Sequence, residues 1–350
     1  MERHDLDILV LGRQANVRYF SGAPQLWVAG TRPFGPICTV VWSTNEIYLN
    51  STWDEGIPDD IPHDHLYGLA WNPMTLISVL AGIDGAATAR RVGTDALSPT
   101  FATLLPTAFP HAELVDGELA MRAARRIKTP DEVTAIRSAL RVAESSLAAA
   151  TAQLRPGVSE QSLAGVLLEA EAAGGVCTPA TQDAAWVTSR EHPWRRATGD
   201  GRIESGDLVA FAAGVLADGY LGEVGRTWPV GDAGEPARNV YRRSNELWDR
   251  LIAACRPGAV GTDLISAYEA AGEHLPPMPI AHGLGLGFDP PLVSSRLPGT
   301  AAEERLEPGM VLAVTGYVWE QGVGAVFTRD AVLITDDGSE VLTASPSYGS

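Results

Sequence analysis

The chain has 350 residues and a net charge of −17, with 45% hydrophobic and 20% charged residues. This length suits two domains of roughly 100–200 residues each, and the composition is that of an ordinary soluble protein. The acidic balance argues against nucleic acid or an anionic membrane as a partner, because both require a basic surface. No apolar run approaches the roughly 18 residues of a membrane-spanning helix. Three widely spaced cysteines form no disulfide or zinc pattern, so we expect a cytoplasmic protein.

Residues 1–122 alternate short β-rich runs with turns and helical stretches. The runs "DILVLG" and "ICTVVWS" are typical of buried strands, and "PMTLISVLAGI" is typical of a helix that begins after a proline. The charged start "MERHD" is unlike a signal peptide. This alternation predicts a small α/β domain.

The most regular helical pattern of the chain follows a domain boundary that we place between residues 122 and 123. Thr129 is a good N-cap, Pro130 suits the first helical position, and Glu132 completes a capping box. Apolar residues then recur at helical spacing until Pro156 ends the helix. A second domain is therefore expected over residues 123–350.

This second domain contains an internal repeat. The segment "LRPGVSEQSLAGVLLEAEAAGG", from Leu154, resembles "CRPGAVGTDLISAYEAAGEHL", from Cys255. Further on, "ESGDLVAFAAG", from Glu204, resembles "EPGMVLAVTGY", from Glu307. Each copy predicts two helices followed by strands. Duplicated halves of this kind place their strands in one sheet with the helices outside, and sites tend to form where such halves meet.

Polar residues that could take part in catalysis or binding occur at four places within the repeat. They are His192 before Pro193, the pair Glu223 and Arg226, His282 at the start of a glycine-rich run, and the pair Arg329 and Asp330. Histidine is the side chain best suited to proton transfer near neutral pH. Each place also has a structural alternative. His192 can be a turn residue, and Glu223 with Arg226 can be a cross-strand ion pair on a solvated face.

Four motifs in order carry a resemblance to a known family: "GDLVAFAAGVLADGYLGEVGRTWPVG", "AHGLGLG", "LEPGMVLAV" and "TRDAVLITDDG". From about Arg125 to Leu342 the chain resembles the pita-bread family, which includes methionine aminopeptidase, aminopeptidase P, prolidase and creatinase. The segment "ANVRYFSG" is similar to the start of the extra N-terminal domain of the last three. The resemblance implies an α+β pita-bread domain with a pseudo-twofold repeat, preceded by a smaller α/β creatinase-type domain.

The metallopeptidases of that family hold two divalent ions with two aspartates, a histidine and two glutamates. The matching positions here hold Ala212, Glu223, His282, Thr315 and Arg329. An arginine among the ligands repels a divalent ion and offers no lone pair. We therefore expect no metal and no cofactor.

Creatinase is similar in fold but works without metal, and its catalytic histidine precedes a glutamate by an interval like that between His192 and Glu223. Carried over, His192 would be the general acid/base, while Glu223 and His282 would position the reacting group. Four further residues are expected to bind substrate: Arg32, Arg226, Thr315 and Arg329. The resemblance thus predicts a metal-independent hydrolase of a C–N bond in a small carboxylated or amide-bearing molecule.

Two alternatives stay open. One is an Xaa-Pro aminopeptidase or prolidase-type metallopeptidase, against which the missing ligands argue. The other is a non-catalytic pita-bread binding protein, against which the joint retention of His192 and Glu223 argues. The resemblance also implies a homodimer in which the N-terminal domain of one subunit contributes to the site of the other, and a small-molecule substrate.

Overall fold

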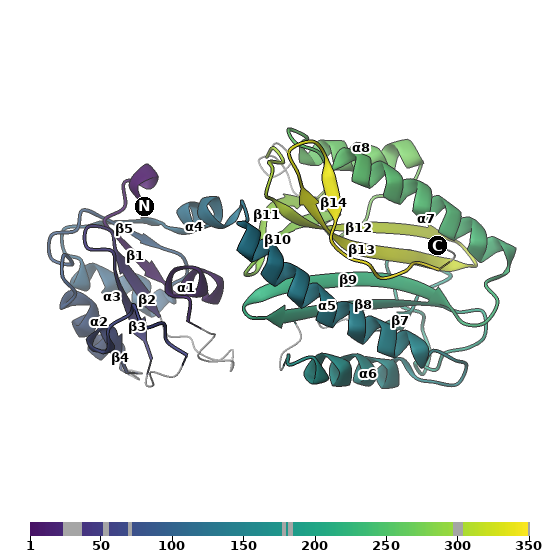
Figure 1. The fold of residues 1–350 in the computed structure, drawn as a ribbon, viewed down its shortest axis with the longest axis horizontal. Coiled ribbons are helices and arrows are strands. Elements are labelled where there is room, and N and C mark those ends of the chain that lie inside the picture. Colours follow the sequence, from purple (N-terminus) through teal and green to yellow (C-terminus); the bar gives the residue numbers. More distant parts are fainter. Residues whose placement is uncertain are drawn as a thin grey trace. The chain divides into compact units, whose positions relative to one another are not determined.

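The computed structural model of the chain describes residues 1–23, 37–51, 56–68, 72–176, 180, 185–296 and 304–348. They form two compact units, Met1–Arg125 and Arg126–Ser350, drawn in Figure 1. The division between them falls close to the boundary predicted between residues 122 and 123. None of the helices in the described part of the chain is long and apolar enough to cross a membrane.

The first unit contains a six-stranded sheet with the strand order β4-β3-β2-β1-β5-β6. Its strands are β1 (Ile8–Leu11), β2 (Cys38–Val41), β3 (Glu46–Asn50), β4 (Leu66–Tyr67), β5 (Arg91–Thr94) and β6 (Glu113–Asp116). Strands β1, β2 and β3 are antiparallel, whereas β4 pairs in parallel with β3, and β5 pairs in parallel with both β1 and β6. The strands predicted in "DILVLG" and "ICTVVWS" are therefore confirmed.

Helices cover both faces of this sheet. The helices of this unit are η1 (Glu2–His4), α1 (Gln14–Ser21), η2 (His63–His65), α2 (Pro73–Ala81), α3 (Pro99–Ala108) and α4 (Glu118–Arg125). Ile8 and Val10 pack with α2 and α3, whereas Leu9 and Leu11 pack with α1 and α4. Successive side chains of a strand point to opposite faces, so four consecutive apolar residues serve both layers. The predicted small α/β domain is confirmed.

The second unit contains one antiparallel sheet with the order β11-β10-β12-β13-β9-β8-β7, and β14 pairs with β13 off this path. Its strands are β7 (Ala185–Val187), β8 (Leu208–Ala217), β9 (Tyr220–Pro229), β10 (Ala281–Leu284), β11 (Phe288–Val293), β12 (Val311–Glu320), β13 (Gly324–Ile334) and β14 (Ser339–Val341). Its helices are α5 (Pro130–Ala152), α6 (Glu160–Ala173), α7 (Gly234–Ala254) and α8 (Gly261–Ala271). The capping box predicted at the start of α5, with Thr129 and Glu132, is present.

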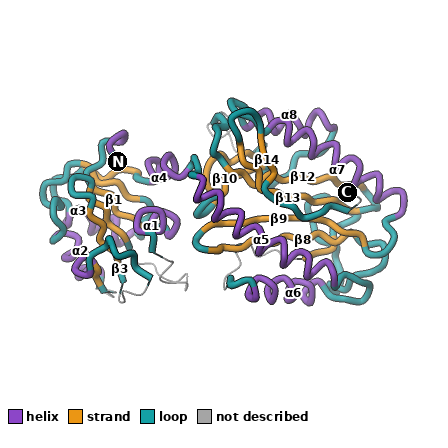
Figure 2. Tube along the Cα trace, in the orientation of Figure 1, coloured by secondary structure: helices purple, strands orange, loops and turns teal. Residues whose placement is uncertain are grey.

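The internal repeat predicted from the sequence is visible in the hydrogen bonds. The Gly157 N–H donates to the Ile203 carbonyl, and the Gly258 N–H donates to the Leu306 carbonyl at the matching place of the second copy. Helices α5 and α6 pack on the β8–β9 hairpin, and helices α7 and α8 pack on the β12–β13 hairpin. Figure 2 shows the two helix pairs lying along their own halves of the sheet.

The two faces of this sheet have different roles. Along β8, Val209 and Phe211 pack under α5 and α6, whereas the alternate residues Ala210 and Ala212 belong to a separate cluster on the other face. The two hairpins join where β9 pairs with β13. The residues that alternate with those under α5 and α6 therefore form a second face of the sheet, which includes Ala210 and Ala212 near the junction of the repeats.

Candidate active site

The candidate site begins with a row of residues across four strands at this junction. Arg329 on β13 lies opposite both Gly225 on β9 and Thr315 on β12. Ala212 on β8 lies opposite Gly225. Directly opposite residues of antiparallel strands share a face. Three members of the row have small side chains or none, which leaves room for the long side chain of Arg329 above the sheet.

Four side chains form what we call the polar cluster: Glu223, His282, Thr315 and Arg329. The Arg329 Nε donates to Thr315 Oγ1 at 3.0 Å, and its Nη1 donates to Glu223 Oε2 at 3.4 Å. His282, on β10, brings Nε2 to 3.2 Å from the same Glu223 oxygen. The Glu223 side chain is only 1% exposed. A buried carboxylate is thus held between a guanidinium and an imidazole.

The neighbours of Glu223 decide its charge. Burial alone raises the pKa of this carboxyl, but the adjacent His282 and the positive charge of Arg329 outweigh burial and hold the pKa below its ordinary value. Glu223 is therefore ionised throughout the neutral range. Because a lowered pKa makes a weak base, its carboxylate is better suited to accept hydrogen bonds than to remove protons.

Two atoms of the polar cluster lack a hydrogen-bond partner in the described ranges: Glu223 Oε1 and His282 Nε2. Although Nε2 lies close to Glu223 Oε2, the two atoms are not aligned as a hydrogen bond. Buried polar atoms in folded proteins are nearly always paired with protein or water. Both atoms are buried, so each would need a bound water molecule or a ligand group as its partner.

A cavity of about 230 Å³ opens beside the cluster. Arg329 and Ala212 belong to its wall, which also includes Trp186, Trp194, Arg195, Arg196, Met278, Tyr317 and Phe327. A volume of this size suits a small molecule rather than a folded protein segment. Arg329 is the member of the polar cluster that lines this cavity, so the cluster and the cavity adjoin each other at its side chain.

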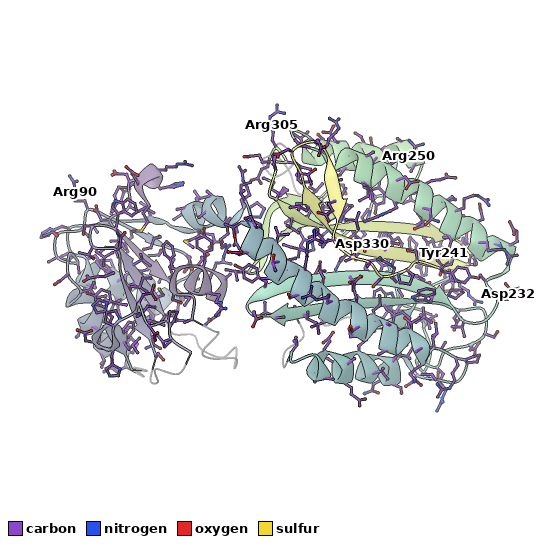
Figure 3. The ribbon with its side chains drawn as sticks, viewed as in Figure 1. Arg90, Asp232, Tyr241, Arg250, Arg305 and Asp330 are labelled. Carbon is purple, nitrogen blue, oxygen red and sulfur yellow. The ribbon has the colours of Figure 1, made fainter. Side chains whose placement is uncertain are left out.

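Arg226, which the sequence analysis placed with Glu223, lies on the opposite face of the sheet. Residues three apart along a strand point in opposite directions. Its Nη2 donates to Asp330 Oδ1 at 2.7 Å and to the Ser345 carbonyl at 2.8 Å. Figure 3 labels Asp330 near the middle of the sheet. Arg226 is thus engaged in holding β13 and the C-terminal segment to β9, and it does not reach the cavity.

Two predicted residues remain, His192 and Arg32. His192 is exposed on the loop after β7, where its backbone N–H donates to Ser189 Oγ, and no described contact joins its ring to Glu223. Arg32 lies outside the described residues. The structure therefore brings together Glu223, His282, Thr315 and Arg329 from the predicted set, and the catalytic roles assigned to them stay predictions.

Several residues of the site were missed by sequence reasoning. Trp194 stacks on Tyr317 with ring centroids 3.5 Å apart, and its backbone N–H donates to the Tyr317 hydroxyl at 2.9 Å. Arg195 and Arg196 follow it and line the cavity. The run "HPWRRATGD" carried a signal, because two arginines beside a tryptophan are unusual in so acidic a chain. Their position relative to β12 and β13 could only come from the fold.

Comparison with known proteins places the chain in a family. Residues 134–336 match the model of metallopeptidase family M24, and residues 1–127 match that of the creatinase/prolidase N-terminal domain. The chain belongs to metallopeptidase family M24. The predicted pita-bread architecture is thereby confirmed. A solved prolidase from Pyrococcus horikoshii has the same fold, with a TM-score of 0.82, 23% identity, and coverage of 99% of this chain and 96% of that one.

The chain matches parts of two further relatives. An uncharacterized peptidase of Staphylococcus aureus is 27% identical over 238 residues, which are 65% of this chain and 65% of that protein. A dimethylsulfoniopropionate lyase of Roseovarius nubinhibens is 31% identical over 259 residues, which are 67% of this chain and 55% of that protein. The chain thus matches about two thirds or less of the length of these relatives.

The expectation of a metal-independent, creatinase-like enzyme is wrong on these findings. The second unit matches a metallopeptidase family, and the structural neighbours include prolidases, an Xaa-Pro dipeptidase and an X-Pro aminopeptidase. The family match favours the metallopeptidase alternative over the metal-independent one, and the structural neighbours share the fold. The expectation relied on four substituted positions, and such substitutions describe one site rather than the relationship of the whole chain.

The family name implies metal ions, and the side chains of the site can be tested for their fit. Within the described residues, no group of three or more His, Cys, Asp or Glu side chains is placed to hold a metal ion. The polar cluster supplies two such side chains, Glu223 and His282, and the Arg329 guanidinium occupies the space beside the carboxylate. These residues do not fit a pair of divalent ions.

Proposed function

We propose that the chain is a hydrolase of small peptides, acting on dipeptides in the cavity beside the polar cluster. The observation that carries this proposal is the buried carboxylate of Glu223, which has one acceptor atom without a partner in the described ranges and pairs with Arg329, a residue of the cavity wall. Membership of metallopeptidase family M24 and the prolidase-like fold support it. The volume of the cavity, about 230 Å³, favours a dipeptide over a longer peptide.

The residues of the cluster have separable roles in such a reaction. Glu223 Oε1 can accept a hydrogen bond from the attacking water and hold it against the carbonyl carbon. The Arg329 guanidinium, whose Nη2 makes no hydrogen bond within the described parts of the chain, can donate to the carbonyl oxygen as that oxygen gains negative charge. Thr315 fixes the orientation of Arg329 through its hydroxyl.

His282 completes this arrangement from the neighbouring strand. Its ring meets Phe288 edge to face, with centroids 4.7 Å apart, and this contact fixes the plane of the imidazole. Its Nε2 faces the cluster without a hydrogen-bond partner there. An imidazole in this position can take up the proton that the attacking water loses and pass it to the leaving amine, so that the proton ends on the amine product.

A panel of dipeptides tests the proposal. Purified protein would be incubated with Xaa-Pro and other dipeptides, with and without added Mn²⁺, Zn²⁺ or Co²⁺, and released amino acids would be measured. We expect hydrolysis of at least one dipeptide that falls strongly in E223Q. E246Q, a matched change on an outer helix, should leave the rate unchanged. No hydrolysis of any dipeptide under any of these conditions would refute the proposal.

A further inference from the structure

The charge of the cavity is opposite to that of the chain. Three of the nine described residues that line it are arginines, and none of these nine is acidic. The whole chain has 26 basic and 43 acidic residues. Glu223, which pairs with Arg329, offsets the charge of that arginine. Arg195 therefore adds positive charge to the cavity wall, which the composition of the chain does not explain.

Arg195 is available to a ligand. Its side chain is exposed, and it makes no ion pair or side-chain hydrogen bond within the described ranges. Arg196 extends over the ring of Trp186, with its guanidinium carbon 5.7 Å from the ring centroid. A guanidinium that already lies on an aromatic wall loses little conformational freedom when an anion binds beside it.

The loop that carries these arginines is held firmly. The Ser189 N–H donates to the Arg195 carbonyl at 3.0 Å, and Thr188 forms an isolated β-bridge with Arg196. Trp194 has a φ of 64°, in the left-handed region that a bulky residue rarely adopts. Its stacking on Tyr317 maintains this conformation. Strain of this kind persists where the surrounding structure fixes it, and it is frequent at ligand sites.

We propose that the cavity selects acidic dipeptides, whose side-chain carboxylate is bound by Arg195. This inference rests on the proposed function and names its substrate class. A neutral dipeptide brings an ammonium group as well as a carboxylate, so it gains little from an excess of guanidinium groups. A glutamate or aspartate side chain adds the negative charge that matches this excess, and arginine binds carboxylates in a two-pronged geometry.

Two pairs of isosteric ligands test the inference by measurements of binding alone. Alanyl-glutamate and alanyl-glutamine differ only in the side-chain carboxylate, and so do glutamyl-alanine and glutaminyl-alanine. Trp186 and Trp194 line the cavity, so rapid-mixing tryptophan fluorescence can report occupancy before any turnover. Of the two acidic peptides, we expect the one that binds better to bind the native protein about tenfold more tightly than its neutral counterpart. One charge-assisted contact would give a difference of this size.

Variants then assign the preference to its residue. R195A should reduce the preference to less than about twofold, whereas R256A, the same change at an exposed arginine that does not line the cavity, should retain it. Raising the salt concentration should weaken the preference, because exposed charges are screened. Equal binding of acidic and neutral peptides, or an unchanged preference in R195A, would overturn the inference.

The two proposals fail in different ways. Hydrolysis of dipeptides without any acidic preference would refute the inference about Arg195 and leave the proposed function standing. Tight binding of acidic dipeptides that are never cleaved would refute the proposed function and support Arg195 as the residue that selects the ligand.

Discussion

Replacement of Arg329 by methionine tests the electrostatic account of the polar cluster. Methionine keeps most of the length of the side chain and removes the charge. The Arg329 Nη1 lies 3.4 Å from Glu223 Oε2, and two unit charges at that separation interact by about 5 kcal/mol at an effective dielectric constant of about 20. The Arg329 side chain is 16% exposed, so solvent reduces this value. We expect R329M to be less stable than the native protein by about 2–4 kcal/mol at pH 8.

The pH dependence of this loss identifies its cause. In the native protein the pKa of Glu223 lies below its ordinary value, so this group stabilises the fold above the pKa of the unfolded chain and loses that contribution as the pH falls through the folded pKa. In R329M burial is less opposed, and the pKa of Glu223 moves upward. The loss should therefore be largest at pH 8 and shrink towards pH 4–5, where the carboxyl takes up a proton.

Urea unfolding at several pH values measures both quantities. The double variant E223Q/R329M provides the control, because a neutral amide has no charge to leave unpaired. It should lose the pH dependence of R329M and recover part of the stability at pH 8. An equal loss for R329M at pH 5 and pH 8, or a double variant as unstable as R329M at pH 8, would contradict the reasoning.

Three other substitutions, one of them with a control variant, test separate features. R226M should lower the free energy of unfolding by about 3–5 kcal/mol, since it leaves a buried carboxylate unpaired, and urea titration would show a smaller loss if the pair were dispensable. G225A should lower the free energy of unfolding by about 1–3 kcal/mol, because a Cβ there overlaps the Phe327 ring. G165A, at a position of α6 with open space around it, should raise this free energy by up to about 1 kcal/mol. Similar shifts in Tm for the two variants would contradict this packing. Y317F should raise KM for acidic dipeptides several-fold with little change in kcat, and an unchanged KM would show that the Trp194 loop needs no such anchor.

Local signals in the sequence predicted much of the fold. The capping box at Thr129 marks the start of α5, as expected. Asp218 and Gly219 both have positive φ, as the hairpin turn between β8 and β9 requires. The repeated segments fold into equivalent halves because each carries its own turns and apolar spacing. These features depend on neighbours in the chain, which a single sequence displays.

The site was harder to predict because it depends on faces and on distant strands. Glu223 and Arg226 were grouped by proximity in the sequence, although an odd separation along a strand places them on opposite faces. Arg195 enters the site through the contact of Trp194 with Tyr317, which lies more than a hundred residues away. No local pattern reports a contact of that kind. The comparison with creatinase failed because it weighed a few positions above the relationship of the whole chain.

The row of small residues around Arg329 constrains how this site could change during evolution. A carboxylate at position 329 alone would face Glu223 without an intervening cation, and a large residue at position 225 would collide with the Phe327 ring. An aspartate at position 212 would instead line the same cavity as Arg329. The effect of each substitution therefore depends on which of the others came first. Conversion between this arrangement and an all-carboxylate one is a problem of mutational order, in which the replacement of Arg329 by a carboxylate is disfavoured as the first step.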